Sequence, residues 1–508
     1  MSSARLLVAL ALALLFATLA ARAPARADAE LPQEKNPWFA SGQKWLAEAR
    51  EREPIDGPAK NVILVIGDGM DVSTITAARI LDGQLRGEPG EENFLAFERF
   101  PHTALVKTYN TDQQVADSAG TATAILSGVK TQAGVIGVDE KVVRGDCASA
   151  KAHAVTSALE LAERAGMSTG VITTARLTHA TPGSAYAHAP ERAWESDADL
   201  PAKAREEGCR DVARQLVEFA EGDGIEVALG GGRDQFLPAV RGAPRGERGI
   251  REDGRNLAKA WTERHPKSAY VKNRAELLAI DPKETDHLLG LFTPSHMAFE
   301  ADRQGGDTGE PSLSEMTARA LDILEKNPKG YLLVVEGGRI DHAHHVTDAR
   351  RALLDTRELA KTAGMLAERT DPEDTLLLVT SDHAHTLSIS GYPARGNPIF
   401  GKVVEPDASG KPSRHPARAD DGMPFTTLGY ANGPNAPGRD GREDLSSVDT
   451  ASPSFRQPAG VPMEMETHGG QDVPVFARGP LAHLLGGTIE QNDLFHLIAA
   501  AAELREKR

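Results

Sequence analysis

The stretch Asn61-Val62-Ile63-Leu64-Val65-Ile66-Gly67 leads directly into Asp68. A continuous run of β-branched residues and leucine of this length is typical of a strand buried on both faces. Three further runs have a similar composition, at 169–174, 331–335 and 375–381. Longer amphipathic stretches separate the runs along the chain. This alternation predicts an α/β fold with a central, mainly parallel sheet that is flanked by helices on both faces.

Acidic residues follow three of these runs, because Asp68, Glu336 and Asp382 each come directly after an apolar stretch. The carboxyl ends of parallel strands meet at one edge of the sheet, where ligands bind in open α/β folds. A single Asp after a strand is most often a turn residue or a helix cap. Three acids at one edge would repel one another, and cations are the usual resolution. The sequence therefore predicts a metal site at this edge.

Histidines lie close to the acids. Asp341 and His345 are four residues apart and share one face if the segment is helical. Asp382 is followed directly by His383, and His468 lies in the glycine-flanked loop 467–471. Imidazole and carboxylate without thiolate suit zinc in a catalytic site that keeps an open position.

Four other histidines are interpreted differently. His153 and His296 are expected to be ordinary surface residues. His344 and His385 are expected to orient their neighbours rather than to bind metal.

A serine lies at the start of a segment of small residues, Asp117–Ala124. If this segment opens a helix, Ser118 lies at the positive end of the helix dipole, where free backbone N–H groups can hold phosphate. Two interpretations remain open, an ordinary serine N-cap and a nucleophile activated by a metal. The chain has no Walker lysine motif and no dinucleotide glycine fingerprint, and Gly230-Gly231-Gly232 is interpreted as a turn.

The first residues have the pattern of a secretory leader. Arg5 precedes the apolar run 6–20, and Ala25-Arg26-Ala27 is a small-x-small cleavage site. We therefore expect residues 1–27 to be a cleaved signal peptide and the product to be periplasmic or secreted. An uncleaved anchor is the alternative. No membrane span is expected in the mature chain, and the C-terminal segment from Leu494 is predicted to be an amphipathic helix.

Two cysteines, Cys147 and Cys209, remain in the exported product. In an oxidising compartment a single pair of cysteines is more often bridged than free. A structural disulfide is therefore predicted, with two buried free thiols as the alternative.

The composition limits the classes of partner. The chain has 508 residues and a formal net charge of −16. An acidic chain of this kind is not expected to bind nucleic acid or anionic lipid, which are held through clustered cations. An anionic small-molecule substrate would need a strong local source of positive charge, which metal ions can supply.

Four motifs together resemble the alkaline phosphatase family, and they are Val65–Met70, Asp117–Ala124, Glu336–His342 and Gly391–Pro393. The resemblance covers the chain from about residue 36 to the C-terminus and is closer to the animal enzymes than to the enteric bacterial type. It implies hydrolysis of phosphate monoesters at alkaline pH through a phosphoserine intermediate.

The resemblance also implies two zinc ions and one magnesium ion. The residues that match the ligands of the first zinc are Asp341, His345 and His468. Those of the second zinc are Asp68, Asp382 and His383. Magnesium would take Asp68, Thr181 and Glu336, with His179 beside it. The residues that match the catalytic groups are the nucleophile Ser118, its neighbour Asp117, the phosphate-binding Arg192, and His342, which would reach phosphate through water.

Some positions differ from the animal pattern. Thr293 occupies a position where those enzymes carry an acid that binds calcium, although Glu310 matches another acid of that site. This difference argues against a calcium ion. His179 lies where enteric-type enzymes carry an acid, which leaves the identity of the third metal open.

The matched residues extend from Asp68 to His468, so residues 28–508 are expected to form one α/β domain. The segment 391–466 resembles the family's crown, a small inserted domain, and the helix expected at 36–52 resembles the arm that embraces a second protomer. A homodimer is therefore expected.

Rival functions are a phosphodiesterase or sulfatase of the same superfamily and a non-catalytic metal- or phosphate-binding protein of the envelope. Sulfatases need a modifiable residue followed by Pro and Arg, which Ser118 lacks. Diesterases commonly use threonine as the nucleophile, and a pure binding protein would not need a serine on a metal.

Overall fold

The computed structural model describes residues 31–240, 248–305, 309–439 and 441–504. The chain divides into two compact units, 1–53 and 54–508. In the first unit, α2 (Pro37–Arg50) begins after Asn36, whose side chain accepts a hydrogen bond from the backbone N of Trp38 at 2.9 Å. The helix expected at 36–52 is thus confirmed. The signal peptide predicted at 1–27 lies outside the described residues.

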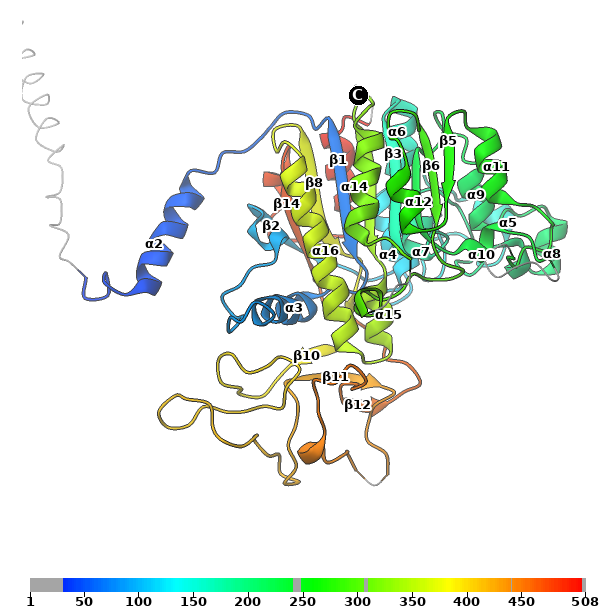
Figure 1. The fold of residues 1–508 in the computed structure, drawn as a ribbon. Coiled ribbons are helices and arrows are strands. Elements are labelled where there is room, and N and C mark those ends of the chain that lie inside the picture. Colours follow the sequence, from blue (N-terminus) through cyan, green and yellow to red (C-terminus); the bar gives the residue numbers. More distant parts are fainter. Residues whose placement is uncertain (1–30, 241–247, 306–308, 440, 505–508) are drawn as a thin grey trace, which may run out of the picture. The chain divides into compact units, whose positions relative to one another are not determined.

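The second unit is built on a ten-stranded sheet, in the order β15-β2-β14-β8-β1-β7-β3-β4-β6-β5 (Figure 1). Its strands are β1 (Asn61–Gly67), β2 (His102–Lys107), β3 (Ser168–Arg176), β4 (Val227–Gly231), β5 (Ser268–Val271), β6 (His287–Leu291), β7 (Tyr331–Gly337), β8 (Thr375–Ser381), β14 (Val473–Arg478) and β15 (Thr488–Glu490). The strands from β8 to β5 are parallel, whereas β14 runs antiparallel to both β8 and β2. The four predicted runs form the adjacent central strands β8, β1, β7 and β3.

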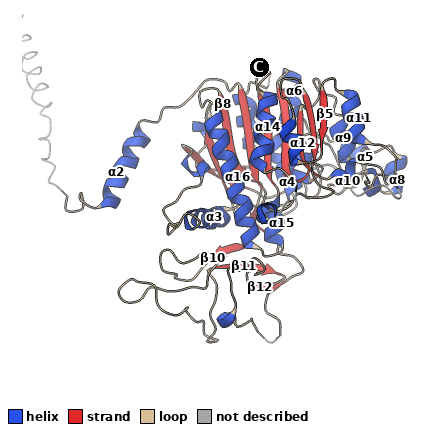
Figure 2. Ribbon diagram, in the orientation of Figure 1, coloured by secondary structure: helices blue, strands red, loops and turns tan. Residues whose placement is uncertain are grey.

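Helices cover both faces of the sheet, as Figure 2 shows. One face packs against α3 (Val72–Gln84), α14 (Leu313–Leu324) and α16 (Ala349–Arg369), and the other against α4 (Ser118–Ser127), α6 (Ala158–Ala165) and α17 (Asp493–Ala501). Alternate residues of β1 enter the two cores: Ile63 and Val65 lie in the first core, Leu64 and Ile66 in the second. Each fully buried side chain of this kind stabilises the fold by about 1.5–3 kcal/mol. The predicted fold is confirmed.

Strand register positions the acidic residues. β1 pairs with β7 so that Ile66 lies opposite Glu336. β1 pairs with β8 so that Gly67 lies opposite Ser381, and the next residues are Asp68 and Asp382. The hydrogen-bond ladder thus brings three acids together at the carboxyl end of the sheet.

Smaller strands follow β8. β9 (Ala384–His385) pairs with β13 (His468–Gly469), so that His385 lies opposite His468. β10 (Leu387–Ile389), β11 (Leu428–Gly433) and β12 (Ala459–Pro462) form a three-stranded sheet, which lies below the large sheet with its long connections (Figure 1). Segment 391–466 supplies β11 and β12, and its identity as a separate inserted domain stays a prediction.

Short helices connect the strands on the β3–β6 side of the sheet and around the site. They are α5 (Cys147–Ala152), α7 (Ala180–Gly183), α8 (Ala202–Glu206), α9 (Val212–Val217), α10 (Arg233–Phe236), α11 (Leu257–Arg264), α12 (Arg274–Ala279), α13 (Glu300–Gly305) and α15 (Arg339–His345). Gly230 and Gly231 end β4, and only Gly232, with a φ of 92°, makes the predicted turn.

The predicted disulfide is present and joins Cys147 to Cys209, with 5.9 Å between their Cα atoms. The C-terminal amphipathic helix is confirmed as α17, which buries Leu494, Phe495 and Ile498. Within the described ranges, no helix combines the length and apolarity that crossing a membrane requires.

Candidate active site

The three acids at the end of the sheet are fully buried. Both carboxylate oxygens of Asp68 lack a hydrogen-bond partner. Burial, together with the charges of Asp382, Asp341 and Glu336, raises the pKa of Asp68 well above its ordinary value. Burial likewise raises the pKa of Glu336 to about 7 and that of Asp382 to about 6. Burying carboxylates without partners is costly, so this arrangement fits a bound cation.

Among the described residues, four overlapping sets of side chains have donor atoms within 4.8 Å of one another, which suits a metal ion. The sets are Asp341, His345, His385 and His468; Asp68, Asp341 and His383; Asp68, His179 and Glu336; and His179, His296 and His342. The first three sets bring together most of the residues that the sequence predicted as ligands.

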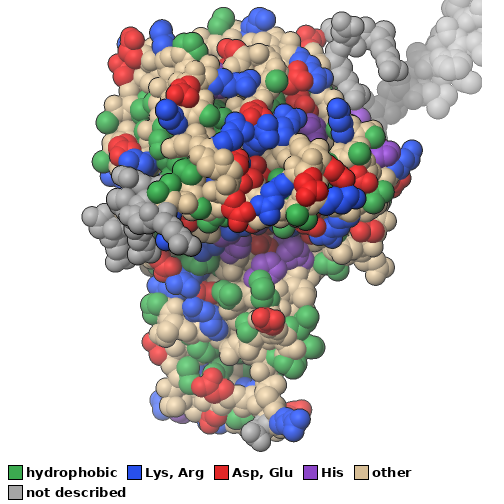
Figure 3. All heavy atoms as spheres, turned by 90° about the vertical axis from the view of Figure 1, so that its right-hand side faces the viewer, with side chains coloured by type: hydrophobic (Ala, Val, Ile, Leu, Met, Phe, Trp, Pro, Cys, Tyr) green, Lys and Arg blue, Asp and Glu red, His purple; other side chains and the backbone are tan. Residues whose placement is uncertain are grey.

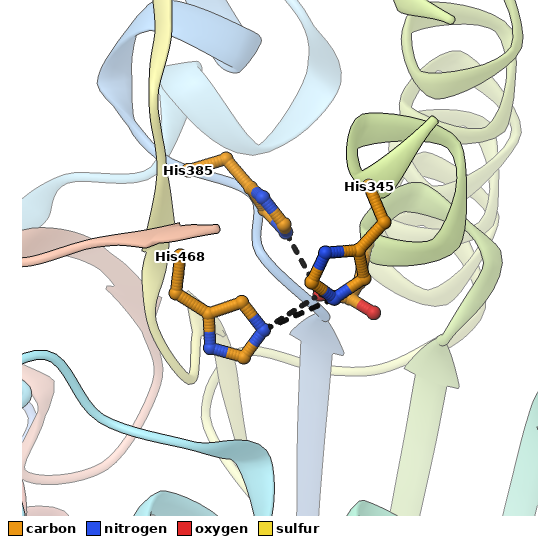
Figure 4. Close-up of side chains that lie close together, drawn as sticks. His345, His385 and His468 are labelled. Atoms are coloured by element: carbon orange, nitrogen blue, oxygen red, sulfur yellow. Dashed lines mark hydrogen bonds and ion pairs between the residues drawn. The ribbon is translucent and has the colours of Figure 1, made fainter. Parts of the chain in front are cut away.

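The first set gathers around Oδ1 of Asp341, and Figure 4 shows its three histidine rings pointing toward one another. Asp341 and His345 lie one turn apart on α15, as the spacing predicted. Oδ1 of Asp341 is 3.3 Å from Nε2 of His345 and 3.3 Å from Nε2 of His468. These two ring nitrogens are themselves only 3.3 Å apart.

Backbone carbonyls decide which ring nitrogen of each histidine faces the acids. Nδ1 of His345 donates to the carbonyl of Glu466 at 2.6 Å, and Nδ1 of His468 donates to that of Ala116 at 2.7 Å. Nδ1 of His383 lies 3.3 Å from the carbonyl of Ala384. With the proton held on Nδ1, each Nε2 presents a lone pair to the carboxylates. This is the tautomer that a metal ligand requires.

His385 differs from these histidines, because both of its ring nitrogens face carboxylates. Nδ1 lies 2.6 Å from Oε2 of Glu466 and Nε2 lies 2.8 Å from Oδ1 of Asp341. Although burial opposes it, the two acids raise the pKa of His385 to about 10. His385 thus contacts Asp341 directly. Its expected role of orienting neighbours rather than binding metal stays a prediction, because His385 also belongs to the first set. His344 is similarly held, by the hydroxyls of Tyr430 and Thr74.

The second set joins the sheet edge to the candidate nucleophile. Nε2 of His383 is 3.3 Å from Oδ1 of Asp68 and 3.4 Å from Oδ2 of Asp382. The same nitrogen lies 3.2 Å from Oγ of Ser118. Burial and the neighbouring His468 hold the pKa of His383 well below its ordinary value, so the imidazole is neutral.

Ser118 is the first residue of α4, and its backbone is positioned by the N-cap Asp117. Oδ1 of Asp117 accepts hydrogen bonds from the backbone N of Gly120 and from Nδ2 of Asn110, both at 3.1 Å. A Cβ at position 120 would lie 2.5 Å from Oδ1 of Asn110, so the small residue is required there. The helix N-terminus predicted from the sequence is confirmed.

Arg192 lies beside this helix end. Its Nη1 is 3.0 Å from Oδ2 of Asp117, and its Nη2 is 3.3 Å from Nε2 of His179. Burial and the charge of Arg192 lower the pKa of His179 well below its ordinary value. Thr181, on α7, is fully buried, and its hydroxyl opposes the rise in the pKa of Glu336. The residues predicted for the third metal therefore meet at the sheet edge.

His296 differs from the sequence expectation. It is half-buried rather than an exposed surface residue, and its ring centroid lies 4.1 Å from that of His342 and 5.3 Å from that of His179. Burial and His342 hold the pKa of His296 far below its ordinary value. His153 is also half-buried, beside Asp139 and away from these sets.

The sequence interpretation missed Glu466 and His296. Glu466 precedes the predicted ligand His468 by two residues, so an extended backbone directs both side chains to one face, and this spacing was a usable signal. His296 lies in a loop and has no such spacing. Only the fold reveals its position.

The surface above these residues is hollowed. Figure 3 shows histidine side chains gathered in a hollow between the larger body of the second unit and its narrower lower part. The site therefore combines solvent access with buried acids, several imidazoles, an arginine and a serine at a helix N-terminus.

Comparisons with known proteins identify the family. The family model described as Alkaline phosphatase matches residues 59–504. The chain is 47% identical to the tissue-nonspecific alkaline phosphatase of Gallus gallus, over 92% of this chain and 90% of that protein. It is 45% identical to the tissue-nonspecific alkaline phosphatase of Homo sapiens, over 92% of this chain and 89% of that protein. It is also 45% identical to an alkaline phosphatase of Gadus morhua, over 94% of this chain and 99% of that protein.

Solved structures have the same fold. The alkaline phosphatase of Thermus thermophilus superposes with a TM-score of 0.62 at 25% identity, over 90% of this chain and 94% of that one. The alkaline phosphatase of the Antarctic bacterium TAB5 superposes with a TM-score of 0.59 at 22% identity, over 88% of this chain and 100% of that one. The chain therefore belongs to the alkaline phosphatase family, the enzymes that hydrolyse phosphate monoesters.

Proposed function

We propose that this phosphomonoesterase transfers the phosphoryl group of its substrate to Ser118, in a centre that holds two zinc ions and one magnesium ion. The observation that carries the proposal is the position of His383. Its Nε2 lies 3.2 Å from Oγ of Ser118 and 3.3 Å from the unpartnered carboxylate of Asp68. The contact of this one imidazole nitrogen with both the serine and a buried acid supports a cation beside Ser118.

The donor types agree with these metals. The residues proposed for the two zinc ions offer imidazole and carboxylate, and they are Asp341, His345 and His468, and Asp68, Asp382 and His383. Those proposed for magnesium offer mainly oxygen, and they are Asp68, Thr181 and Glu336, with His179 beside them. The unpartnered oxygens of buried Asp68 support this assignment.

When bound, the cations supply Lewis acidity that lowers the pKa of a serine hydroxyl and stabilises a departing alkoxide. The chain supplies the nucleophile and its orientation. Oγ of Ser118 attacks phosphorus while the bond from phosphorus to the alcohol oxygen breaks. The free backbone N–H groups at the start of α4 and their dipole favour the negative phosphate.

Arg192 is proposed to bind two phosphate oxygens with its planar guanidinium. Asp117 holds Nη1 of that guanidinium at 3.0 Å, which restricts its orientation before substrate arrives. His342 is proposed to reach a phosphate oxygen through water. Attack by water on the phosphoserine then releases inorganic phosphate and restores Ser118.

We also infer that the active form is a homodimer. Trp38 and Trp45 on α2 are 72% and 61% exposed, as is unusual for tryptophan in an isolated subunit. In the second unit, Tyr392 is 83% exposed and is a further large side chain that a second protomer would cover. Light scattering of the purified protein tests the inference, because a monomeric mass at micromolar concentration contradicts it.

Export through a signal peptide cleaved after Ala27 is likewise proposed. The leader pattern and the Cys147–Cys209 disulfide support an oxidising compartment. Sequencing the N-terminus of the product recovered outside the cytoplasm tests the cleavage site.

The central experiment compares an aryl phosphate monoester, the corresponding diester and a sulfate ester with one enzyme preparation. The proposal expects the monoester to be hydrolysed fastest at alkaline pH, with loss of activity after chelation and recovery with zinc. Ser118→Ala should abolish turnover and the acid-stable phosphoprotein formed with radiolabelled substrate. A variant that retains most of the rate would exclude the covalent route, and a faster diester reaction would favour the phosphodiesterase.

A further inference from the structure

His296 lies in the loop between β6 and α13, next to the residues proposed to meet phosphate. Its imidazole centroid is 4.1 Å from that of His342, with the two rings tilted by 54°. It is 5.3 Å from the centroid of His179, which in turn contacts Arg192.

The loop that carries His296 is tightly anchored. The carbonyl of Ser295 accepts hydrogen bonds from the backbone N of Gly232 and from the hydroxyl of Thr293, both at 2.7 Å. The backbone N of Met297 donates to the carbonyl of Thr174 at 3.0 Å. A Cβ at Gly231 would lie 2.2 Å from the Ser295 carbonyl oxygen, so glycine permits this close approach. The backbone at position 296 is therefore fixed on both sides.

Arg176 fixes the side chain. Its backbone N lies 3.2 Å from Nδ1 of His296, and its Nη1 lies 2.5 Å from Nε2. The guanidinium is held in turn by Glu195, through Nε at 2.7 Å and Nη2 at 2.5 Å. A continuous chain of contacts thus runs from Glu195 through Arg176 to His296.

This arrangement argues against a metal ion on His296, although its ring lies near two other histidines. Both ring nitrogens face Arg176, and the single lone pair of a neutral imidazole accepts from one of these two donors, so none is left for a cation. The positive guanidinium next to Nε2 would also repel a cation. What His296 offers to the site is the face of its ring, which packs on His342.

His342 needs such support. Its Nδ1 is buried and has no hydrogen-bond partner. The ring is therefore oriented by packing against His296 and His179 rather than by a hydrogen bond at that nitrogen. A small rotation of the ring would displace the nitrogen that faces phosphate, and displacements of this size weaken binding strongly.

We propose that His296 is a positioning residue that holds the imidazole of His342 in the orientation in which it meets the phosphate group of substrate and product. The inference rests on the proposed role of His342. The backbone of the loop 293–297 and the side chain of Arg176, at the end of β3, together hold His296 in place against it.

The test compares His296→Ala and His296→Gln with Ser295→Ala. The alanine variant should raise KM for an aryl monoester and the inhibition constant of inorganic phosphate about fivefold, with a smaller change in kcat. Glutamine offers Arg176 an acceptor and should restore part of the loss. Ser295→Ala removes only a 3.3 Å contact to the same guanidinium and should leave both constants near the wild type. Bound zinc and magnesium should be unchanged in all three variants.

A double-mutant cycle separates this inference from the proposed function. If His296 acts through His342, the variant that combines His296→Ala with His342→Ala binds phosphate no more weakly than His342→Ala alone. Additive effects, an unchanged inhibition constant in His296→Ala, or loss of one metal equivalent would each overturn the inference. If His342→Ala itself leaves phosphate inhibition unchanged, the proposed role of His342 fails instead.

Discussion

The carboxylate of Glu466 lies 2.6 Å from Nδ1 of His385, and both side chains are fully buried. The other oxygen of Glu466 accepts hydrogen bonds from the backbone N and the hydroxyl of Thr386. Glu466 is therefore held rigidly, and through His385 it orients Asp341, the acid at the centre of the first metal set. Glu466 lies in the loop before β13, His385 in β9 and Asp341 on α15, so the three residues come from segments far apart in sequence.

Glu466→Gln should weaken metal retention. Without the carboxylate, the pKa of His385 falls, and the imidazolium that orients Asp341 is lost. Groups in this position typically change metal affinity about 10–100-fold. The measurement is zinc content after dialysis against graded chelator. Glu464→Gln, an exposed acid two residues earlier, is the matched control and should match the wild type. Equal zinc retention in the two variants would show that the contact with His385 has no such role.

Arg192→Lys should weaken phosphate binding while the protein stays folded. Lysine keeps the charge but cannot bind two oxygens at once, so KM and the inhibition constant of phosphate should rise about tenfold or more. Inhibition by inorganic phosphate measures this directly. Arg164→Lys, which alters a bidentate pair with Glu221 on the surface, serves as control. The same phosphate affinity in Arg192→Lys would argue against the two-oxygen contact.

Glu163 and Glu226 form a buried acidic pair at the other end of the sheet. The hydroxyl of Thr169 donates to Glu163 at 2.5 Å, and its backbone N donates to Glu226 at 2.6 Å. Burial, and then the charge of Glu226, raises the pKa of Glu163 to about 9. Since the folded-state pKa lies above the ordinary value of 4.5, the stability from this group is present below that value and is lost as pH rises towards 9.

The stability of Glu163→Gln relative to that of the wild type should therefore increase as the solution becomes alkaline. Glutamine cannot ionise, so the melting temperature of the variant minus that of the wild type should increase between pH 5 and pH 9. Thermal unfolding at several pH values measures the difference. Glu221→Gln, on the surface, should show a flat difference over the same range. Parallel curves for Glu163→Gln and wild type would contradict the assigned pKa.

Replacing both Cys147 and Cys209 by serine should lower stability without changing the reaction. The bridge closes a loop with a sequence separation of 62 residues, and loops of this length typically contribute about 2–4 kcal/mol. Denaturant unfolding should show the loss, with kcat and KM near the wild type at moderate temperature. Unfolding midpoints that coincide with those of the wild type would mean that the disulfide adds little.

The sequence was sufficient for the sheet and for most of the site. Apolar runs such as 62–66 have no polar face, which is typical of strands buried on both sides, and acids that directly follow parallel strands meet at one edge. The four-residue spacing of Asp341 and His345 likewise places both side chains on one face of a helix. These are local patterns, and local backbone geometry explains why they could be interpreted correctly.

The position of His296 could not be predicted from such local patterns. Its neighbours in sequence, Ser295 and Met297, carry no metal or phosphate chemistry, and its proposed role depends on Arg176 and His342, which come from other elements. An isolated histidine in a loop is usually exposed, and only packing shows otherwise. The pairing of β9 with β13 similarly brings His385 next to Glu466, a contact that no spacing within one segment could establish.

The sequence by itself determined the central strands, the helix that begins at Ser118, and the acids and histidines that follow the strands. Each follows from side-chain periodicity or from residues adjacent in the chain. The tertiary structure alone decided which imidazole nitrogen faces the acids, which histidines support others, and that Oγ of Ser118 lies 3.2 Å from His383. Hydrogen bonds between distant segments set these relations, because burial leaves each polar atom only the partners that the fold brings to it.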